Sequence, residues 1–213
     1  MWRTYFRSTR AHNTIEVDGE DQGGQAGPFM WSSHADAVVD QAEAGAHGVQ
    51  TWAGHHTGYA RLDPALRHDR HVALDGPEGR LSVTDTVTGS RVHSLRMFWH
   101  LGPDVDVQLE DAVAHLTWRG RDDIDHHGRL ELPAALGWSD HTGETGPPLG
   151  WYSPRFGQKV PLTTLVGVGT WTGTLSLRTD LRFSSPGAPA AVRRAPDLVV
   201  TSAAVPRQDW GSS

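Results

Sequence analysis

Apolar and polar residues alternate with a period of two along most of this chain, which is the pattern of half-buried β-strands. No window carries a sustained apolar stripe at helical spacing, and only residues 63–66 suggest a single helical turn. Short alternating runs occur at residues 14–17, 37–40, 50–53, 71–74 and 80–87. The pattern predicts an all-β fold with a strand roughly every eight to twelve residues, as in a sandwich or a large curved sheet.

Turn residues place the connections between these strands. Asp18-Gly19 ends the first run, and residues 75–79 separate two strands of a hairpin, because Asp-Gly pairs adopt tight-turn backbone conformations. A further turn is predicted at residues 88–90. The remaining strands are expected at residues 92–101, 105–109, 114–118, 162–168 and 174–181.

Two segments lack this alternation. Residues 119–150 are polar and rich in glycine and histidine, so they are predicted to form a long surface excursion between strands. Residues 184–213 are predicted to form a linker and a C-terminal tail. The sequence therefore predicts one domain over residues 1–183, and its dense pattern from Tyr5 onward suggests that the chain starts inside a larger fold.

Composition narrows the chemistry. The chain has 213 residues, a net charge of -6 and no cysteine, which excludes disulfides, thiolate metal ligands and a cysteine nucleophile. It has no cluster of Lys and Arg for nucleic acid, no apolar run of roughly 18 residues for a membrane span, and no secretory signal at its start. The 13 histidines and nine tryptophans suit metal or proton chemistry and sugar stacking, although core packing also uses tryptophan.

The first candidate site is the Arg10-Ala11-His12-Asn13-Thr14 segment, which precedes a strand and contains the single asparagine of the chain. His12 and Asn13 could bind a metal or polarise a carboxylate, or they could satisfy backbone groups of a turn.

A second candidate is a group of histidines on two predicted strands. His55 and His56 must point to opposite faces of an extended strand, whereas His68 and Arg70 share a face. Such spacing permits a metal site, and it equally suits cross-strand polar pairs on a solvated face.

Two later segments complete the candidates. His93, Leu95, Met97 and Trp99 share one strand face, which favours a core role with His93 at its edge. Residues 150–157 combine Trp151, Tyr152 and Arg155 with two glycines, and they could form either a sugar-contact loop or a rigid corner.

The order of several motifs resembles the heparinase II/III-like polysaccharide lyase family. Residues 5–22 resemble its "AHNT-VDG-DQ" signature, and the resemblance extends over about residues 3–183. Further matching stretches lie at residues 27–31, 56–62, 68–70, 81–85, 93–103 and 151–157.

This resemblance implies an architecture and an activity. Family members carry an N-terminal α/α-toroid followed by a large antiparallel β-sandwich, or supersandwich, and they cleave uronate-containing acidic polysaccharides such as glycosaminoglycans by β-elimination. This chain would be the sandwich without the toroid and without its own first strands. It would require the missing toroid and an acidic polysaccharide as partners, and a secreted, periplasmic or cell-envelope location is favoured.

The resemblance also assigns site residues. The catalytic Tyr, His and Asn of the family lie mainly in the toroid, so no catalytic residue is assigned here. His12 matches one zinc ligand of the family, and its partners would precede Met1. We therefore expect zinc only in the intact parent, no tight metal binding here, and no lyase activity from this chain alone.

Substrate contacts are expected from residues with arginine, amide or indole groups, namely Arg10, Asn13, Trp151 and Arg155. Further arginines that could line the contact face are Arg7 and Arg61. The alternative function is a non-catalytic carbohydrate-binding or scaffold β-sandwich module, or a degenerate relative without catalysis.

Overall fold

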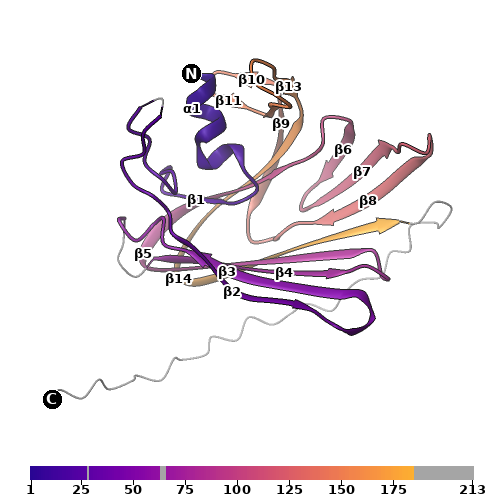
Figure 1. Ribbon diagram of the computed structural model, residues 1–213, viewed down its shortest axis with the longest axis horizontal. Coiled ribbons are helices and arrows are strands. Elements are labelled where there is room, and N and C mark those ends of the chain that lie inside the picture. Colours follow the sequence, from indigo (N-terminus) through magenta and orange to yellow (C-terminus); the bar gives the residue numbers. More distant parts are fainter. Residues whose placement is uncertain (28, 63–65, 185–213) are drawn as a thin grey trace.

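A computed structural model describes residues 1–27, 29–62 and 66–184 of the chain, and a single antiparallel sheet of ten strands dominates it (Figure 1). The strands of this sheet are β1 (Ile15–Val17), β2 (Ala37–Ala44), β3 (Val49–His56), β4 (Arg67–Asp75), β5 (Arg80–His100), β6 (Val105–Glu110), β7 (Val113–Arg119), β8 (Asp125–Glu131), β9 (Gly137–Thr142) and β14 (Thr163–Ser184). Two small hairpins pair β10 (Glu144–Thr145) with β11 (Pro148–Leu149), and β12 (Trp151–Tyr152) with β13 (Val160–Pro161).

Two long strands, β5 and β14, form the middle of the sheet. They pair with each other from His100 opposite Thr164 to Arg80 opposite Arg182. At one end the strand order is β2-β3-β4-β5-β14-β8-β7-β6, while at the other end β1 flanks β5 and β9 flanks β14. The sheet curls so that β6, β7 and β8 rise above β4 and β5 (Figure 1). The predicted all-β antiparallel fold class is confirmed.

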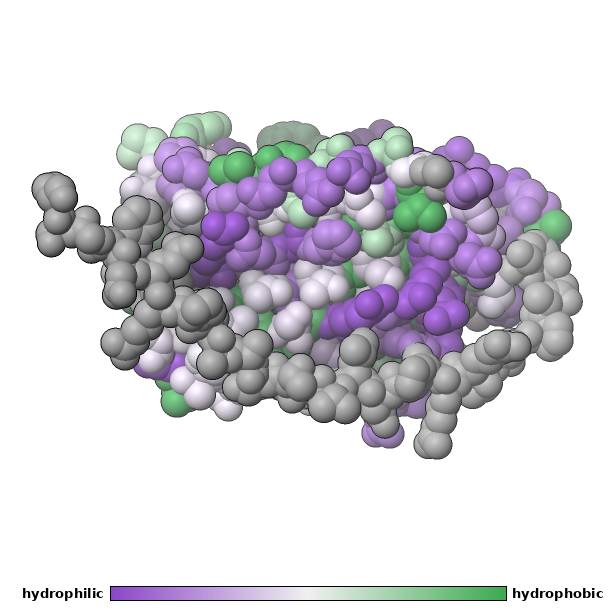
Figure 2. Space-filling view, turned by 90° about the horizontal axis from the view of Figure 1, so that it is seen from below, coloured by the Kyte–Doolittle hydropathy of each residue, from purple (hydrophilic) through white to green (hydrophobic). Residues whose placement is uncertain are grey.

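Alternation along the strands gives the sheet one apolar and one polar face. The face seen from below in Figure 2 is largely hydrophilic, with only scattered apolar side chains. All eight residues of β2 are exposed, because this strand is the sheet edge.

The turn predicted at residues 88–90 is wrong, because β5 continues through it. A Cβ on Gly89 would lie 2.6 Å from Cδ2 of His93, so this glycine makes room for a side chain within a strand. The two predicted last strands are likewise one strand, β14, whose register shifts between Trp171 and Gly173.

The surface excursion predicted at residues 119–150 is also wrong. This segment contains β8 and β9, which both pair with β14. Leu130 of β8 is buried while its neighbours Arg129 and Glu131 form an ion pair, so charged residues concealed the buried positions of the strand. The predicted helical turn at residues 63–66 falls mostly on residues 63–65. The tail predicted over residues 184–213 falls on residues 185–213, apart from Ser184, which ends β14. Both stretches lie outside the described residues.

Two apolar clusters form the core. The first contains Ile15, Val17, Tyr59, Leu66, Val87, Leu95, Met97, Leu136, Trp171 and Leu177. The second contains Ala114, Leu116, Leu130, Leu132 and Leu165. Trp99 and Trp138 pack against both clusters, so the two ends of the sheet share one continuous apolar interior.

The sequence did not predict the N-terminal helix α1 (Trp2–Arg7), which is followed by a 3₁₀ turn at Thr9–Ala11. A second 3₁₀ turn lies at Ala46–Gly48. A helix of six residues is too short to be stable alone and shows too few turns for a periodic pattern. Burial of Tyr5, whose carbonyl accepts a hydrogen bond from Ser8 Oγ at 2.6 Å, holds it in place. No helix among residues 1–27, 29–62 and 66–184 is long and apolar enough to cross a membrane.

Candidate functional site

The structure places three of the predicted site residues close together in the chain: Arg10 lies in the 3₁₀ turn, and His12 and Asn13 lie in the short connection from that turn to β1. The side chains of His12 and Asn13 are exposed. Asn13 Oδ1 accepts a hydrogen bond from the backbone N–H of His100 at 2.6 Å, so the asparagine joins this connection to the end of β5.

His100 holds the same connection through its ring. Nε2 of His100 donates to the carbonyl of Arg10 at 3.0 Å, while Nδ1 accepts from the hydroxyl of Thr164 at 2.8 Å. Burial lowers the pKa of His100 to about 4, and the nearby charge of His12 acts in the same direction. The ring is therefore neutral at pH 7, with Nε2 protonated and available to the Arg10 carbonyl.

A hollow of about 260 Å³ lies beside His12. Its wall is polar and includes Arg7, Thr9, His12, Gln22, Trp31, Ser33 and His34. The guanidinium of Arg7 lies 4.1 Å from the centroid of the Trp31 ring and donates to the carbonyl of Gly27 at 2.7 Å. An imidazole, hydroxyl groups and an arginine around one hollow suit a polar or anionic ligand.

The other predicted contacts lie elsewhere. Arg10 lines a separate hollow of about 300 Å³ together with Pro147 and Pro148. Trp151 donates its indole N–H to the carbonyl of Glu144 at 2.6 Å. Arg155 is exposed and donates to Gln158 at 2.7 Å within its own loop. The structure thus brings Arg10, His12 and Asn13 together but not Arg155, and substrate contact by any of them stays a prediction.

The residues around His12 do not by themselves make a zinc site. Among the residues that the structure describes, no group of three His, Asp or Glu ligand atoms within 4.8 Å of one another includes His12. Since a structural zinc ion requires about four ligands, the donor set present here is incomplete.

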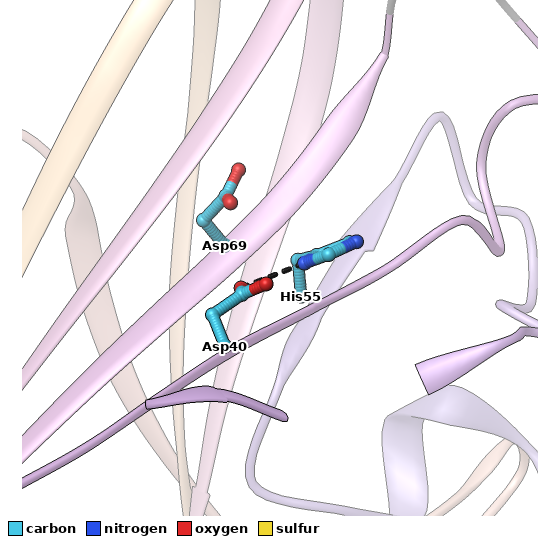
Figure 3. Close-up of side chains that lie close together, drawn as sticks. All are labelled: Asp40, His55 and Asp69. Atoms are coloured by element: carbon cyan, nitrogen blue, oxygen red, sulfur yellow. Dashed lines mark hydrogen bonds and ion pairs between the residues drawn. The ribbon is translucent and has the colours of Figure 1, made fainter. Parts of the chain in front are cut away.

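The group that does meet this criterion is formed by Asp40, His55 and Asp69, on three neighbouring strands (Figure 3). His55 Nδ1 lies 2.7 Å from Asp40 Oδ2, and Arg67 donates to Asp69 Oδ1 at 2.6 Å. Arg67 also lies 3.9 Å from Asp40, so its charge already offsets both exposed carboxylates. The arrangement is an ion-pair cluster on a solvated face, which was one of the two interpretations of these histidines.

The expected facing of His55, His56, His68 and Arg70 is confirmed. His56 and His68 are opposite each other in β3 and β4, with 2.9 Å between Nε2 and Nδ1, whereas His55 points to Asp40. His68 and Arg70 both reach Asp85 of β5. Sequence reasoning missed Asp85, although the hairpin register from Asp75 opposite Arg80 leads directly to Arg70 opposite Asp85.

His93 is not an edge residue, and that part of the expectation is wrong. It is 1% exposed, and its ring stacks on Trp171 with 5.0 Å between centroids. Its Nδ1 lies 2.8 Å from Oδ2 of Asp18. β5 is buried here because β14 pairs with it at His93 and β1 ends beside it, with Val17 opposite Leu95.

Comparisons with known proteins agree with this architecture. The family model "Heparinase II/III-like, C-terminal" matches residues 1–193. No curated protein matches the chain. Among solved structures, heparan sulfate lyase HepC from Pedobacter heparinus is similar, with a TM-score of 0.65, 16% identity, and coverage of 88% of this chain and 26% of that chain.

Two further structures show the same fold. A heparinase III gene product has a TM-score of 0.63 at 14% identity, covering 86% of this chain and 25% of its own. Another heparinase III structure has a TM-score of 0.64 at 15% identity, covering 88% and 25%. The chain therefore spans about a quarter of the length of these structures. Its match to the family model over residues 1–193 shows that it belongs to the heparinase II/III-like family, within the C-terminal β-sandwich part.

Proposed function

We propose that this chain is the C-terminal portion of a polysaccharide lyase that cleaves uronate-containing acidic polysaccharide by β-elimination, and that it is inactive alone. The observation that carries the proposal is the exposed His12 on a connection held by His100, beside a polar hollow that contains Arg7 and Trp31. The family membership and the quarter-length coverage of the similar lyase structures support it.

The proposed reaction makes clear demands on its site. A base removes the proton next to the uronate carboxylate, the bond to the 4-linked oxygen breaks, a ring double bond forms, and the leaving oxygen takes up a proton. Neutralising the carboxylate acidifies the C–H bond, and an acid and a base must be in place. In this proposal the chain contributes one wall of the cleft, and a preceding toroid contributes the acid and base.

The residues of this wall would bind and orient the polymer. His12 offers an exposed imidazole, Arg7 adds positive charge in the same hollow, and Arg10 adds positive charge in the separate hollow beside Pro147, which suits carboxylate or sulfate groups. Zinc would require ligands from a preceding part of the protein in addition to His12. Because such polymers occur outside the cytoplasm, we propose an exported parent protein.

One observation favours a second function, a non-catalytic carbohydrate-binding module. Phe29 and Trp31 are 86% and 40% exposed, and the guanidinium of Arg3 lies 4.7 Å from the centroid of the Phe29 ring. Exposed aromatic rings beside arginines can stack on sugars without any catalysis.

The decisive experiment begins with the gene. An open reading frame that continues upstream in frame into a helical toroid supports the lyase, and a promoter directly upstream of Met1 favours the binding module. The longer protein is then incubated with heparan-type, alginate-type and exopolysaccharide substrates, and unsaturated uronate is measured by its ultraviolet absorbance.

A matched pair of variants tests the role of this wall. His12→Ala is expected to lower product formation at least about tenfold, because an oriented polar contact to the reacting sugar is lost. His115→Ala, at an exposed position on β7, is expected to leave it unchanged. Product from the isolated chain, or full activity of the His12→Ala protein, would contradict the proposal.

A further inference from the structure

A chain of polar side chains crosses the inner strands β3, β4 and β5. His56 lies 2.9 Å from His68, and Nε2 of His68 lies 2.6 Å from Oδ1 of Asp85. Arg70 donates to the same carboxylate twice, from Nε at 2.7 Å and from Nη2 at 3.0 Å. Asp85 is 0% exposed and His68 3%, so these groups can be stable only if their hydrogen bonds are complete.

The donors and acceptors in this chain fit only one arrangement of protons. The backbone N–H of Gly58 donates to Nδ1 of His56 at 3.1 Å, so the proton of His56 is on Nε2. Nε2 of His56 then donates to Nδ1 of His68, and Nε2 of His68 donates to Asp85. Both imidazoles are therefore neutral, and Asp85 is a carboxylate whose charge Arg70 balances.

The electrostatics agree with this assignment. Burial lowers the pKa of His56 to about 4, and the charge of Arg70 acts in the same direction. Burial alone would raise the pKa of Asp85. The hydrogen bonds from His68 and Arg70 and the charge of Arg70 outweigh it and hold that pKa below its usual value.

Arg70 connects this chain to the candidate site. With Nε and Nη2 committed to Asp85, its remaining nitrogen Nη1 donates to the carbonyl of Asn13 at 2.6 Å. The connection that carries His12 is thus held from one side by Arg70 and from the other by His100, which contacts Arg10 and Asn13.

We propose that Arg70, locked by Asp85, His68 and His56, is a positioning residue that fixes the Asn13 backbone and thereby orients the exposed side chains of His12 and Asn13. The effect of this positioning on polysaccharide binding and cleavage rests on the proposed function. The positioning of the Asn13 backbone by Arg70 does not depend on that function. A lysine cannot replace Arg70, because a single ammonium group cannot donate to both carboxylate oxygens of Asp85 and also reach the Asn13 carbonyl, as the planar guanidinium does.

The test compares Arg70→Lys and Arg70→Gln with Arg80→Lys and Arg80→Gln in this chain. Arg80 forms a similar cross-strand pair with Asp180, with nitrogens at 3.0 and 2.7 Å from Oδ1. Within the described part of the chain, it forms no hydrogen bond or ion pair with the His12 connection. The Arg80 variants therefore control for the general loss of an arginine–carboxylate pair.

Hydrogen exchange provides the first readout. The amide of His100 is bonded to Asn13 Oδ1 and that of Phe98 to the Thr14 carbonyl, so both report on this connection. In both Arg70 variants, the amide hydrogen of His100 should exchange with solvent about tenfold faster or more. The nuclear magnetic resonance signal of the His12 ring should also shift. The Arg80 variants should change neither. Unchanged exchange in folded Arg70→Lys, or the same change in Arg80→Lys, would overturn the inference.

A second measurement needs no variant. In the unmodified chain, ¹⁵N spectra should show His56 and His68 as neutral rings protonated at Nε2, with a scalar coupling across the hydrogen bond between them. Charged rings or the opposite tautomers would overturn the proposed lock, even if the Arg70 variants failed to fold.

The functional consequence is tested separately in the longer protein. If the lyase proposal holds, Arg70→Lys should lower kcat/KM in the native background and have little further effect in a His12→Ala background, because it acts through that residue. Additive losses would overturn positioning through His12. Absence of lyase activity in the native protein would overturn the proposed function, while the exchange result would still decide the structural inference.

Discussion

The ammonium group of Lys159 lies 3.4 Å from the centroid of the Trp151 ring and 4.2 Å from that of Trp2. This residue is the single lysine of the chain, and it joins the loop before β13 to helix α1. The rings of Trp2 and Trp151 also meet in a T-shaped arrangement, with 5.2 Å between ring centroids. One indole face of the predicted sugar-binding tryptophan is thus already covered by the protein itself.

Replacing this lysine tests whether Trp151 can serve a ligand. Lys159→Gln should lower the free energy of unfolding by about 1 kcal/mol, because a cation–π contact is lost. It should also increase quenching of tryptophan fluorescence by a neutral quencher, and Arg121→Gln, at an exposed position, should do neither. If the covered face binds sugar, Lys159→Gln will raise affinity for acidic oligosaccharides measured by calorimetry. An affinity that falls would assign the contact to Lys159 instead.

Gly150 is required by both its backbone and its surroundings. It has a φ of 75°, and a Cβ there would lie 2.7 Å from the carbonyl oxygen of His141. Gly157 also has a φ of 75°, but its Cβ would meet nothing within 4 Å. Gly157→Ala should cost about 1 kcal/mol of unfolding free energy through the backbone alone, and Gly150→Ala clearly more. Urea titrations of the two variants measure the difference, and equal losses would contradict the predicted clash.

Asp18 of the "VDG" motif organises the end of β1. Its carboxylate accepts from the backbone N–H of Ser94 at 2.9 Å and lies 2.8 Å from Nδ1 of His93. Burial would raise the pKa of Asp18, but the hydrogen bonds from His93 and Ser94 lower it overall. Asp18→Asn keeps a residue that tolerates the φ of 53°, but it presents an N–H to His93 in place of a carboxylate oxygen. We therefore expect the free energy of unfolding to fall by about 1–3 kcal/mol.

A matched control for this variant is Asp111→Asn. Asp111 has a φ of 51° and is exposed, so its replacement should be nearly neutral in thermal unfolding. A large loss at Asp111 would attribute the effect to backbone conformation rather than to His93 and Ser94.

Stability should fall as the solution is acidified from pH 6.5 to 4. The pKa values of His56 and His100 are about 4 in the folded chain and return to about 6.5 on unfolding, so the unfolded chain binds more protons in this range. The contribution of each buried, neutral histidine to the free energy of unfolding is complete above pH 6.5. It is lost as the pH falls toward 4, by up to about 3 kcal/mol per histidine. Below pH 4, protonation of carboxylates with lowered pKa values, such as Asp85 and Asp18, adds to the loss.

Urea unfolding at several pH values measures this slope. His56→Gln and His100→Gln should each flatten this slope between pH 6.5 and 4. A slope that persists in both glutamine variants would assign the effect to other groups.

The sequence predicted the local features of the fold better than the long-range ones. The hairpin of β4 and β5 and the facing of His68 and Arg70 follow from alternation and one turn signal, and both are confirmed. The contact between Arg70 and Asn13 spans 57 positions, so no local pattern contains it.

The errors share a physical cause, which is that one residue type serves two structural purposes. Gly89 suggested a turn but provides space for His93 within a strand. The polar residues of β8 suggested a loop, yet Leu130 between them is buried. For the candidate site, motif order located Arg10, His12 and Asn13, but only tertiary structure revealed that Arg70 and His100 hold this connection and that Asp85 fixes Arg70.

The 21 residues of β5 and the 22 residues of β14 run through both apolar clusters without a break. Both halves of the molecule therefore share β5 and β14, and the chain cannot be divided into two separate halves without breaking these strands. Shortening the domain from the side of β6–β8 would strip partners from the same polypeptide segments that support the His12 connection. Heating should accordingly disassemble the molecule in a single cooperative step rather than one half at a time.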